Sequence, residues 1–249
     1  MPQILRVVTA RRGLKRLSTL LLVITIALCL IAATPSKFAA VSIHRQAPDD
    51  SSFFVKPPTN GKFIATGATA RLMVMLAWDL QDSQIAGGPA WFATDRFVID
   101  ANSDDNRPRS AVETREMLQS MLADRFALRT HHEMREGTAY ALTVAKNGSK
   151  LKQSQTQATN VRIGANSIQL EGARLSRLAQ QLSGILERPV IDRTGLEGTY
   201  DASLTWADAQ PDQPSVFTAI QDQLGLNLIS QRTPIDTLVI DAIAPPSPN

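Results

Sequence analysis

The chain has 249 residues, of which 43% are hydrophobic and 20% are charged, which is typical of globular protein and sufficient for two modest hydrophobic cores. It carries 26 basic and 23 acidic side chains, but five of the basic ones and none of the acidic ones precede Ala33, which leaves 21 against 23 for the remainder. A surface for nucleic acid needs clustered Lys and Arg, so this balance argues against nucleic acid as a partner.

The first 33 residues have the layout of an export signal. Five basic side chains come first: Arg6, Arg11, Arg12, Lys15 and Arg16. An apolar run from Leu17 to Ala33 follows them, and this order is typical of a secretory signal peptide. The run is at the lower limit of length for crossing a bilayer, so a retained anchor is the alternative. We predict an exported protein, periplasmic or extracellular, or attached to the inner membrane through Leu17 to Ala33.

Cys29 is the only cysteine, and it lies inside the apolar run. A lipid-modified cysteine follows a small residue, whereas Leu28 is bulky, so we interpret Cys29 as an apolar residue of the run. A chain cleaved after this run has no thiol, which excludes disulfides, thiolate catalysis and cysteine-based zinc sites. We predict no cofactor and no metal ion.

After the signal, Phe38 to Ile43 has the pattern of a short strand. The apolar face of the first helix is predicted from helical spacing: Leu72, Met73, Leu76 and Leu80. Ser110 and Glu113 form a capping box, which predicts the start of a second helix. Its apolar face consists of four side chains: Met117, Leu118, Met121 and Leu122.

The second half repeats this order. Helical spacing predicts one helix with an apolar face of Leu175, Leu178, Leu182 and Ile185. Ser215 is the expected cap of another helix with Phe217, Ile220 and Leu224 on its buried face, and Gly225 is the expected left-handed residue at its end. Alternation predicts strands at Leu226 to Ile229 and Thr237 to Ile240.

The two halves match at a nearly constant shift. Gly67-Ala68 corresponds to Gly172-Ala173 at 105 residues, and Phe97 corresponds to Tyr200 at a slightly shorter shift. We predict an α+β fold of two tandem related modules, each a strand, a helix, two strands, a helix and a hairpin, with the helices packed on small mixed sheets. The expected boundaries are 1–33 for the signal, 38–146 for the first module, 147–160 for a polar linker, 161–245 for the second module and 246–249 for a Pro-rich tail.

Several stretches resemble an uncharacterised bacterial family known as the soil-associated proteins, which is defined by a domain of unknown function. They begin at Gln84 (QIAGGPAWF), Met117 (MLQSMLADRF), Arg188 (RPVIDRTGLEGTYD) and Gln223 (QLGLNL). The resemblance implies an exported protein without established activity or assigned catalytic residues. Leu175 to Leu182, Gly198 and Ala219 to Leu226 also resemble, in outline, the small N-terminal domains of secretins and TonB-dependent receptors, which supports the fold more than the function.

Two glycine-containing segments are candidate binding sites. Arg193, Gly195 and Gly198 lie in a stretch where glycines with positive φ bring backbone donors close to a partner, and Arg193 would face an acidic group or a peptide terminus. Gly87, Gly88 and Trp91 occupy the equivalent place in the first half, where an exposed Trp91 would anchor a partner. The structural alternative is that both segments are turns and that Trp91 covers the first core.

His131 and His132 are followed by Glu133, but adjacent side chains of a strand point to opposite faces and cannot bind one metal ion. We expect the pair at a solvated hairpin tip. The chain contains no Gly-x-Ser-x-Gly elbow, His-Glu-x-x-His helix or phosphate-binding glycine loop. We therefore predict a noncatalytic envelope protein that binds an unknown envelope protein or peptide. The alternatives are a membrane-anchored sensor ectodomain and an envelope polymer hydrolase with unidentified carboxylates.

Overall fold

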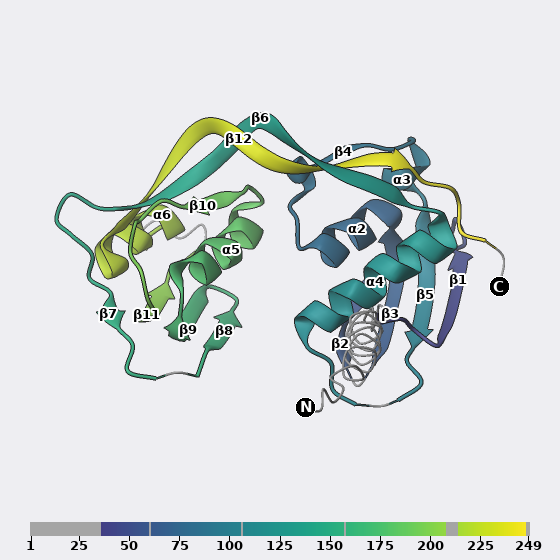
Figure 1. Cartoon of the computed structure of the whole chain (residues 1–249), viewed down its shortest axis with the longest axis horizontal. Coiled ribbons are helices and arrows are strands. Elements are labelled where there is room, and N and C mark those ends of the chain that lie inside the picture. Colours follow the sequence, from purple (N-terminus) through teal and green to yellow (C-terminus); the bar gives the residue numbers. More distant parts are fainter. Residues whose placement is uncertain (1–35, 60, 106, 157, 208–213, 248–249) are drawn as a thin grey trace, which may run out of the picture. The chain divides into compact units, whose positions relative to one another are not determined.

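The computed structural model describes residues 36–59, 61–105, 107–156, 158–207 and 214–247 (Figure 1). The predicted signal and its apolar run lie outside the described residues. No helix in the described ranges has the length and hydrophobicity needed to cross a membrane. Lys37–Asn249 forms one compact unit, within which two hydrophobic cores are distinguished.

The first core lies under an antiparallel sheet of β1 (Ala40–Arg45), β5 (Arg96–Asn102), β3 (Lys62–Thr69) and β2 (Phe54–Thr59), in that order. Helices α2 (Ala70–Trp78) and α4 (Ala111–Phe126) cover one face of this sheet (Figure 1). The short helix α3 (Trp91–Thr94) and the 3-10 turn η1 (Asp82–Gln84) flank them. As predicted, Ser110 and Glu113 form the capping box of α4, and its four expected apolar side chains are buried.

The second core is built from a sheet with the order β7 (Lys152–Gln153), β11 (Tyr200–Thr205), β9 (Ser167–Ala173) and β8 (Asn160–Gly164). Helix α5 (Leu175–Leu186) buries Leu175, Leu178 and Leu182 as predicted, and the fourth expected side chain, Ile185, is partly buried against the same core. Helix α6 (Val216–Ala219) begins at the expected cap Ser215 and continues as the π-helical turn η2 (Ile220–Leu224). Gly225 ends this turn with φ of 65°, in the left-handed conformation expected from the sequence.

A third sheet joins the two halves of the chain. Its central strands are β6 (Arg129–Val144) and β12 (Leu226–Ala242), which lie side by side and antiparallel along their length (Figure 1). Strand β4 (Ile85–Gly87) pairs in parallel with the end of β12, and β10 (Val190–Asp192) pairs in parallel with the end of β6. Strand β12 contributes to both cores, with Leu226 in the second and Leu238 in the first. Strand β6 begins directly after Leu128 of the first core and contributes Leu142 to the second.

The prediction of a hairpin at the end of each half is therefore wrong. Leu226 to Ile229 and Thr237 to Ile240 are parts of the single strand β12, whose partner β6 comes from the other half of the chain. The alternating pattern specifies a strand and its buried face, but it is the same whether the partner is near or distant in sequence. Two parallel neighbours, β4 and β10, then complete a sheet that is mixed, as expected.

The α+β class is confirmed, and the strand order is equivalent in the first two sheets. Gly67 and Gly172 both adopt positive φ, 73° and 61°, within β3 and β9. A Cβ at either position would lie 2.5 or 2.3 Å from a backbone carbonyl oxygen, of Ser52 and Ala158 respectively, so only glycine fits. These similarities accord with duplicated modules, and common origin stays a prediction that superposition of the halves would test.

Two predicted helix faces need correction. In α2 Met73 is buried as predicted, and Leu72 and Leu80 are partly buried against the first core, although the helix ends before Leu80 at the left-handed Asp79. Leu76, by contrast, is 38% exposed, and the other buried side chains are Ala70, Val74 and Ala77. In α6, Phe217 is 39% exposed and packs its edge against the Tyr140 ring, with 5.4 Å between the ring centroids. Both helices are short, so two adjacent faces fit the same apolar spacing, and packing against neighbouring elements selects one of them.

The predicted linker and tail both contain ordered contacts. Within residues 147–160, β7 pairs with β11, and Asn160 begins β8. At the C-terminus the amide of Ala244 donates to the Phe126 carbonyl at 2.7 Å, and the amide of Ser247 donates to the Arg125 carbonyl at 2.9 Å. The described part of the tail is thereby attached to the end of α4.

Candidate functional site

Gly87, Gly88 and Trp91 form a turn against the first core. Gly87 ends β4 beside Ile240, and a Cβ at Gly88 would lie 2.7 Å from the Phe92 ring. Trp91 is half-buried and packs edge to face with Phe97, with 6.4 Å between the centroids. These contacts match the structural alternative considered for Trp91, and a binding role for this segment stays a prediction.

Arg193, Gly195 and Gly198 lie in the connection between β10 and β11, against the second core. The Asp192 carboxylate accepts hydrogen bonds from the amide and hydroxyl of Thr194, at 3.0 and 2.7 Å, which fixes the turn. The Arg193 side chain is exposed and its amide donates to the Leu142 carbonyl. The two glycine segments thus belong to different cores and do not combine into one site.

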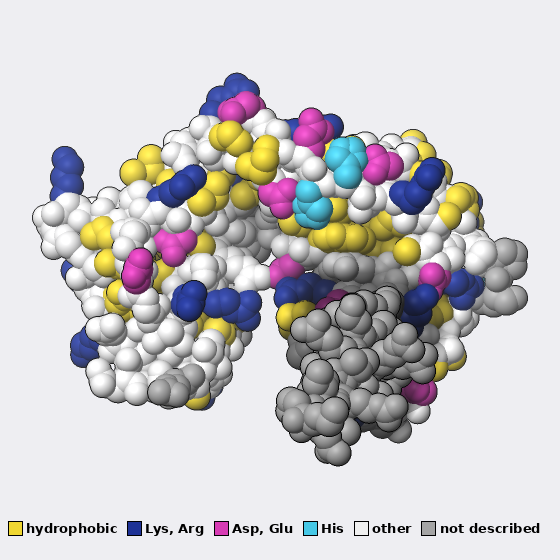
Figure 2. Space-filling model, in the orientation of Figure 1, with side chains coloured by type: hydrophobic (Ala, Val, Ile, Leu, Met, Phe, Trp, Pro, Cys, Tyr) yellow, Lys and Arg dark blue, Asp and Glu magenta, His cyan; other side chains and the backbone are white. Residues whose placement is uncertain are grey.

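The histidine pair is not at a hairpin tip, which corrects that prediction. His131 and His132 lie within β6, and each is hydrogen-bonded through Nδ1 to the carboxylate of an aspartate in β12. The distance is 2.8 Å from His131 to Asp241, and 2.9 and 3.0 Å from His132 to the two oxygens of Asp236. Figure 2 shows histidine and acidic side chains intermingled on the surface over these strands. No group of three or more potential metal-ligating side chains gathers anywhere in the described ranges.

The outer edge of β6 is the feature that the sequence pattern did not indicate. Near its end, Tyr140 donates its amide to the Pro189 carbonyl and Leu142 accepts from the Arg193 amide, so even-numbered residues of β6 direct their backbone groups away from β12. Along a strand, the backbone N–H and C=O groups of successive residues point alternately to one neighbouring strand and to the other. The pairing of β6 with β12 has no register shift over His131 to Val144, so the same orientation extends back to His132.

Four residues of β6 therefore present N–H and C=O groups on its outer edge: His132, Met134, Glu136 and Thr138. Strand β10 covers only Tyr140 to Leu142, and no other strand of the described residues pairs with this edge. All four side chains are exposed, and Met134 is 62% exposed. Such an edge can pair with an added strand.

The outer edge of β12 differs. Its even-numbered residues also direct their backbone groups outward, because they lie opposite even-numbered residues of β6, as Asp236 does opposite Met134. Pro234 lies at one of these outward positions and has no N–H to donate. The carbonyl of Asp236 accepts a hydrogen bond from the Gln84 side chain at 3.1 Å. The edge of β12 is therefore partly blocked, whereas the edge of β6 contains no proline.

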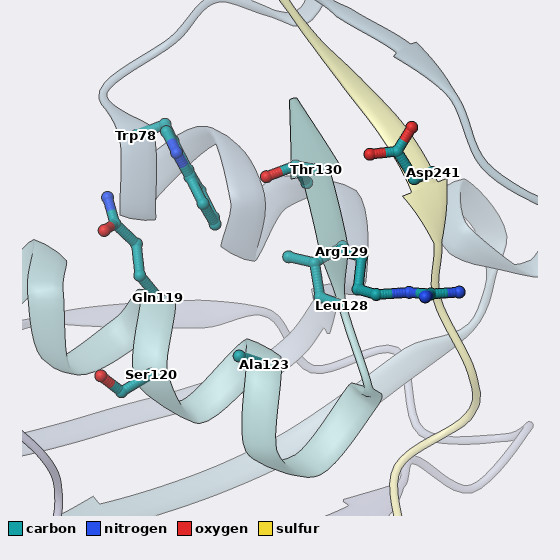
Figure 3. Close-up of a pocket in the computed structure, with 8 residues that line it drawn as sticks. All are labelled: Trp78, Gln119, Ser120, Ala123, Leu128, Arg129, Thr130 and Asp241. Atoms are coloured by element: carbon teal, nitrogen blue, oxygen red, sulfur yellow. The ribbon is translucent and has the colours of Figure 1, made fainter. Parts of the chain in front are cut away.

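A concavity of about 660 Å³ opens at the beginning of β6 (Figure 3). Eight residues line it: Trp78, Gln119, Ser120, Ala123, Leu128, Arg129, Thr130 and Asp241. In Figure 3 the Trp78 ring and the Thr130 side chain lie on opposite sides of the space between α2, α4 and β6. The Gln119 side chain donates to the Ala77 carbonyl at 2.8 Å, which ties the end of α2 to α4 beside this space.

A second concavity, of about 450 Å³, shares Ala123, Leu128 and Arg129 with the first and extends to Ala242 to Ala244. Together they form a groove between α4 and the start of β6. None of its lining residues was predicted from the sequence, because they come from two helices and two strands that only the fold brings together. An extended segment paired with β6 would place alternate side chains on the side of this groove.

The charges on the exposed part of β6 are of both signs. Glu133 and Arg135 are about half-exposed and bonded to one another, with 2.7 Å between Arg135 Nη2 and Glu133 Oε2. The chemistry offered by this part of β6 is backbone hydrogen bonding, an exposed thioether and neighbouring acidic and basic groups. This set suits recognition of an extended polypeptide.

No curated protein and no solved structure matches the chain. A family model does match, over residues 71–243, which is more than half of the chain and includes β6, β12 and most of both cores. The chain therefore belongs to the family described as Protein of unknown function (DUF3738).

Proposed function

We propose that this protein is a noncatalytic, exported envelope protein that binds an extended protein segment by strand addition along the outer edge of β6. The observation that carries the proposal is the run of four outward-facing backbone positions from His132 to Thr138, with exposed side chains and no proline. Each position offers one donor and one acceptor, so an added strand gains several main-chain hydrogen bonds. The groove beside Thr130 would receive one of its side chains.

The edge is well suited to this function because β6 is held at both ends. Its start lies next to Leu128 in the first core, and Leu142 is fully buried in the second core. Pairing with β12 fixes the strand in between. A preorganised strand loses little conformational entropy on binding, so more of the hydrogen-bond energy appears as affinity.

The test compares two substitutions at one edge position. Peptides selected from a display library on the full chain in detergent are assayed against Met134→Pro and Met134→Thr. Proline removes one edge N–H, which would weaken binding about tenfold, because a peptide carbonyl loses its donor. Threonine keeps the N–H and is a good strand former, so binding should change less than about threefold.

Loss of binding in both variants would point to recognition of the Met134 side chain, and loss in neither would refute strand addition at this edge. Thermal unfolding of each variant shows whether the fold is retained. Thr138→Pro repeats the test at a second edge donor. If no selected peptide binds at all, the proposal also fails.

The membrane-anchored sensor and the polymer hydrolase stay predictions, as do the relation to soil-associated proteins and the likeness to secretin and TonB-receptor domains. N-terminal sequencing of the protein from its native envelope tests the sensor. A mature N-terminus near residue 34 would exclude an anchor through Leu17 to Ala33. Hydrolysis of envelope polymers by the purified chain would replace the binding proposal with the enzymatic one.

A further inference from the structure

The exposed edge of β6 is complementary to itself when reversed. Thr130 to Thr138 has the sequence THHEMREGT, with Met134 at its centre. Glu133 and Arg135 flank the centre with opposite charges, and the next positions outward are His132 and Glu136. The ends of the segment are both threonine. Such a pattern suits pairing with an identical segment running in the opposite direction.

The backbone allows this pairing. Even-numbered residues present their N–H and C=O groups on the free edge, so a second β6 must also contribute even-numbered residues to the hydrogen-bonded pairs. A two-fold axis through Met134 meets this condition. It places Met134 opposite Met134, His132 opposite Glu136 and Thr130 opposite Thr138.

The side chains favour the same register. On one face His132 of each copy lies opposite Glu136 of the other, and on the opposite face Glu133 lies opposite Arg135. The opposite charges of Glu133 and Arg135 directly across the two strands stabilise the pair, as do paired threonines. Gly137 lies opposite His131 and leaves room for the imidazole. The centre buries Met134, which is 62% exposed in the single chain.

Neighbouring registers are less favourable. A two-fold axis at position 133 places Glu133 against Glu133, and an axis at 135 places Arg135 against Arg135. An axis at 132 places Arg129 against Arg135, and an axis at 136 places Glu136 against Glu136. Like charges across two strands are destabilising, so the sequence disfavours each alternative and selects the axis at Met134.

We propose that the partner of the β6 edge is a second copy of this chain, and that two chains pair antiparallel about Met134 into one continuous sheet. This inference rests on the proposed function, because it names the segment that the edge binds. The interface is isologous, since the same residues contribute from both copies. The third sheet of each copy then extends across the two-fold axis into the other.

Charge reversal tests the register. The full chain and its variants are compared by sedimentation in a density-matched mild detergent. Glu133→Arg and Arg135→Glu each replace two attractive pairs by two repulsive pairs, so we expect the dimer dissociation constant to rise about thirtyfold for each variant. An equimolar mixture of the two variants restores both attractive pairs and should form a heterodimer. The double variant, Glu133→Arg with Arg135→Glu, should again form a homodimer.

The matched control is Glu197→Arg, which makes the same charge change at an exposed residue of the β10–β11 connection. It should dimerise like the unmodified chain. Circular dichroism shows that each variant folds, and recovery in the mixture excludes misfolding as the cause of a lost dimer.

Three results would overturn the inference: a monomeric unmodified chain at all concentrations, a dimer that both single reversals leave intact, or a mixture that stays monomeric. The peptide assay with Met134→Pro separates this failure from that of the proposed function. If the chain is monomeric but binds peptides, and Met134→Pro abolishes that binding, only the identity of the partner is wrong.

Discussion

Substitution of Leu238 tests whether β12, near the end of the sequence, completes the first hydrophobic core, most of which comes from the first half of the chain. Leu238 lies in β12, is fully buried in the first core and pairs with Ile85 of β4. Leu238→Ala removes three carbon atoms, and burial of each is worth about 0.8 kcal/mol. With the cost of the remaining cavity, we expect the free energy of unfolding to fall by about 3 kcal/mol.

Urea unfolding measures the total loss, and amide hydrogen exchange locates it. We expect faster exchange in α2 and α4, which belong to the first core, although the substitution is more than a hundred residues away from them in sequence. Leu142→Ala is the matched variant, because Leu142 is equally buried in the second core, and it should increase exchange in α5 instead. Ile163→Ala, at a 57% exposed position, should change stability by less than about 0.5 kcal/mol.

The reasoning fails if Leu238→Ala leaves the exchange of α2 and α4 unchanged, or if Leu238→Ala and Leu142→Ala increase exchange in the same elements. A loss below about 1 kcal/mol would also contradict the burial of Leu238, because a fully buried leucine costs at least about 2 kcal/mol to truncate.

Three further outcomes are expected. Gly67→Ala should lower the free energy of unfolding by more than about 2 kcal/mol, because the left-handed backbone and a 2.5 Å contact with a carbonyl oxygen both oppose a Cβ. A thermal unfolding midpoint equal to that of the unmodified chain would contradict this expectation. Hydrogen bonds from Arg107 and from the helix cap lower the pKa of Glu113 to about 2, so its stabilising contribution is present above pH 4.5 and lost as the pH falls towards 2. Glu113→Gln should therefore destabilise the protein at pH 6 but not near pH 2 in urea titrations. Arg135→Pro removes an N–H that faces β12 and should lower the free energy of unfolding by about 3 kcal/mol, whereas Met134→Pro should lower it by less than about 1 kcal/mol. Equal losses for the two variants in urea unfolding would refute the assigned orientation of the β6 edge.

Local signals predicted much of the fold. The capping box of Ser110 and Glu113, the left-handed Gly225 and the apolar face of α5 are each determined by residues within a few positions of one another. Hydrogen bonding and side-chain packing at such short range depend little on the remainder of the chain. The match of Gly67 with Gly172 likewise marked two positions with the same backbone requirement.

Long-range pairing was not predictable from the same patterns. The alternation at Leu226 and at Thr237 is correct for strands, but it does not reveal that both belong to β12 or that β6 is the partner. The candidate groove was missed for the same reason, because Trp78 and Leu128 are fifty residues apart in sequence and become neighbours of one space only through packing of α2, α4 and β6. Faces of short helices also depend on these contacts, as Leu76 and Phe217 show.

The contrast between the two long strands favours β6 as the functional edge. Proteins block exposed strand edges with prolines, charges or covering groups because an open edge pairs with other chains. On β12, Pro234 and the hydrogen bond from Gln84 to Asp236 provide such blocks. On β6, the described residues leave four successive edge positions open, and Glu133 and Arg135 carry opposite charges instead of a repulsive run of one sign. Charges of one sign would discourage pairing with another copy, whereas this arrangement disfavours the neighbouring registers on either side of the one centred on Met134. The edge of β6 is thus open to an added strand, and its charges accord with the pairing about Met134 that we propose.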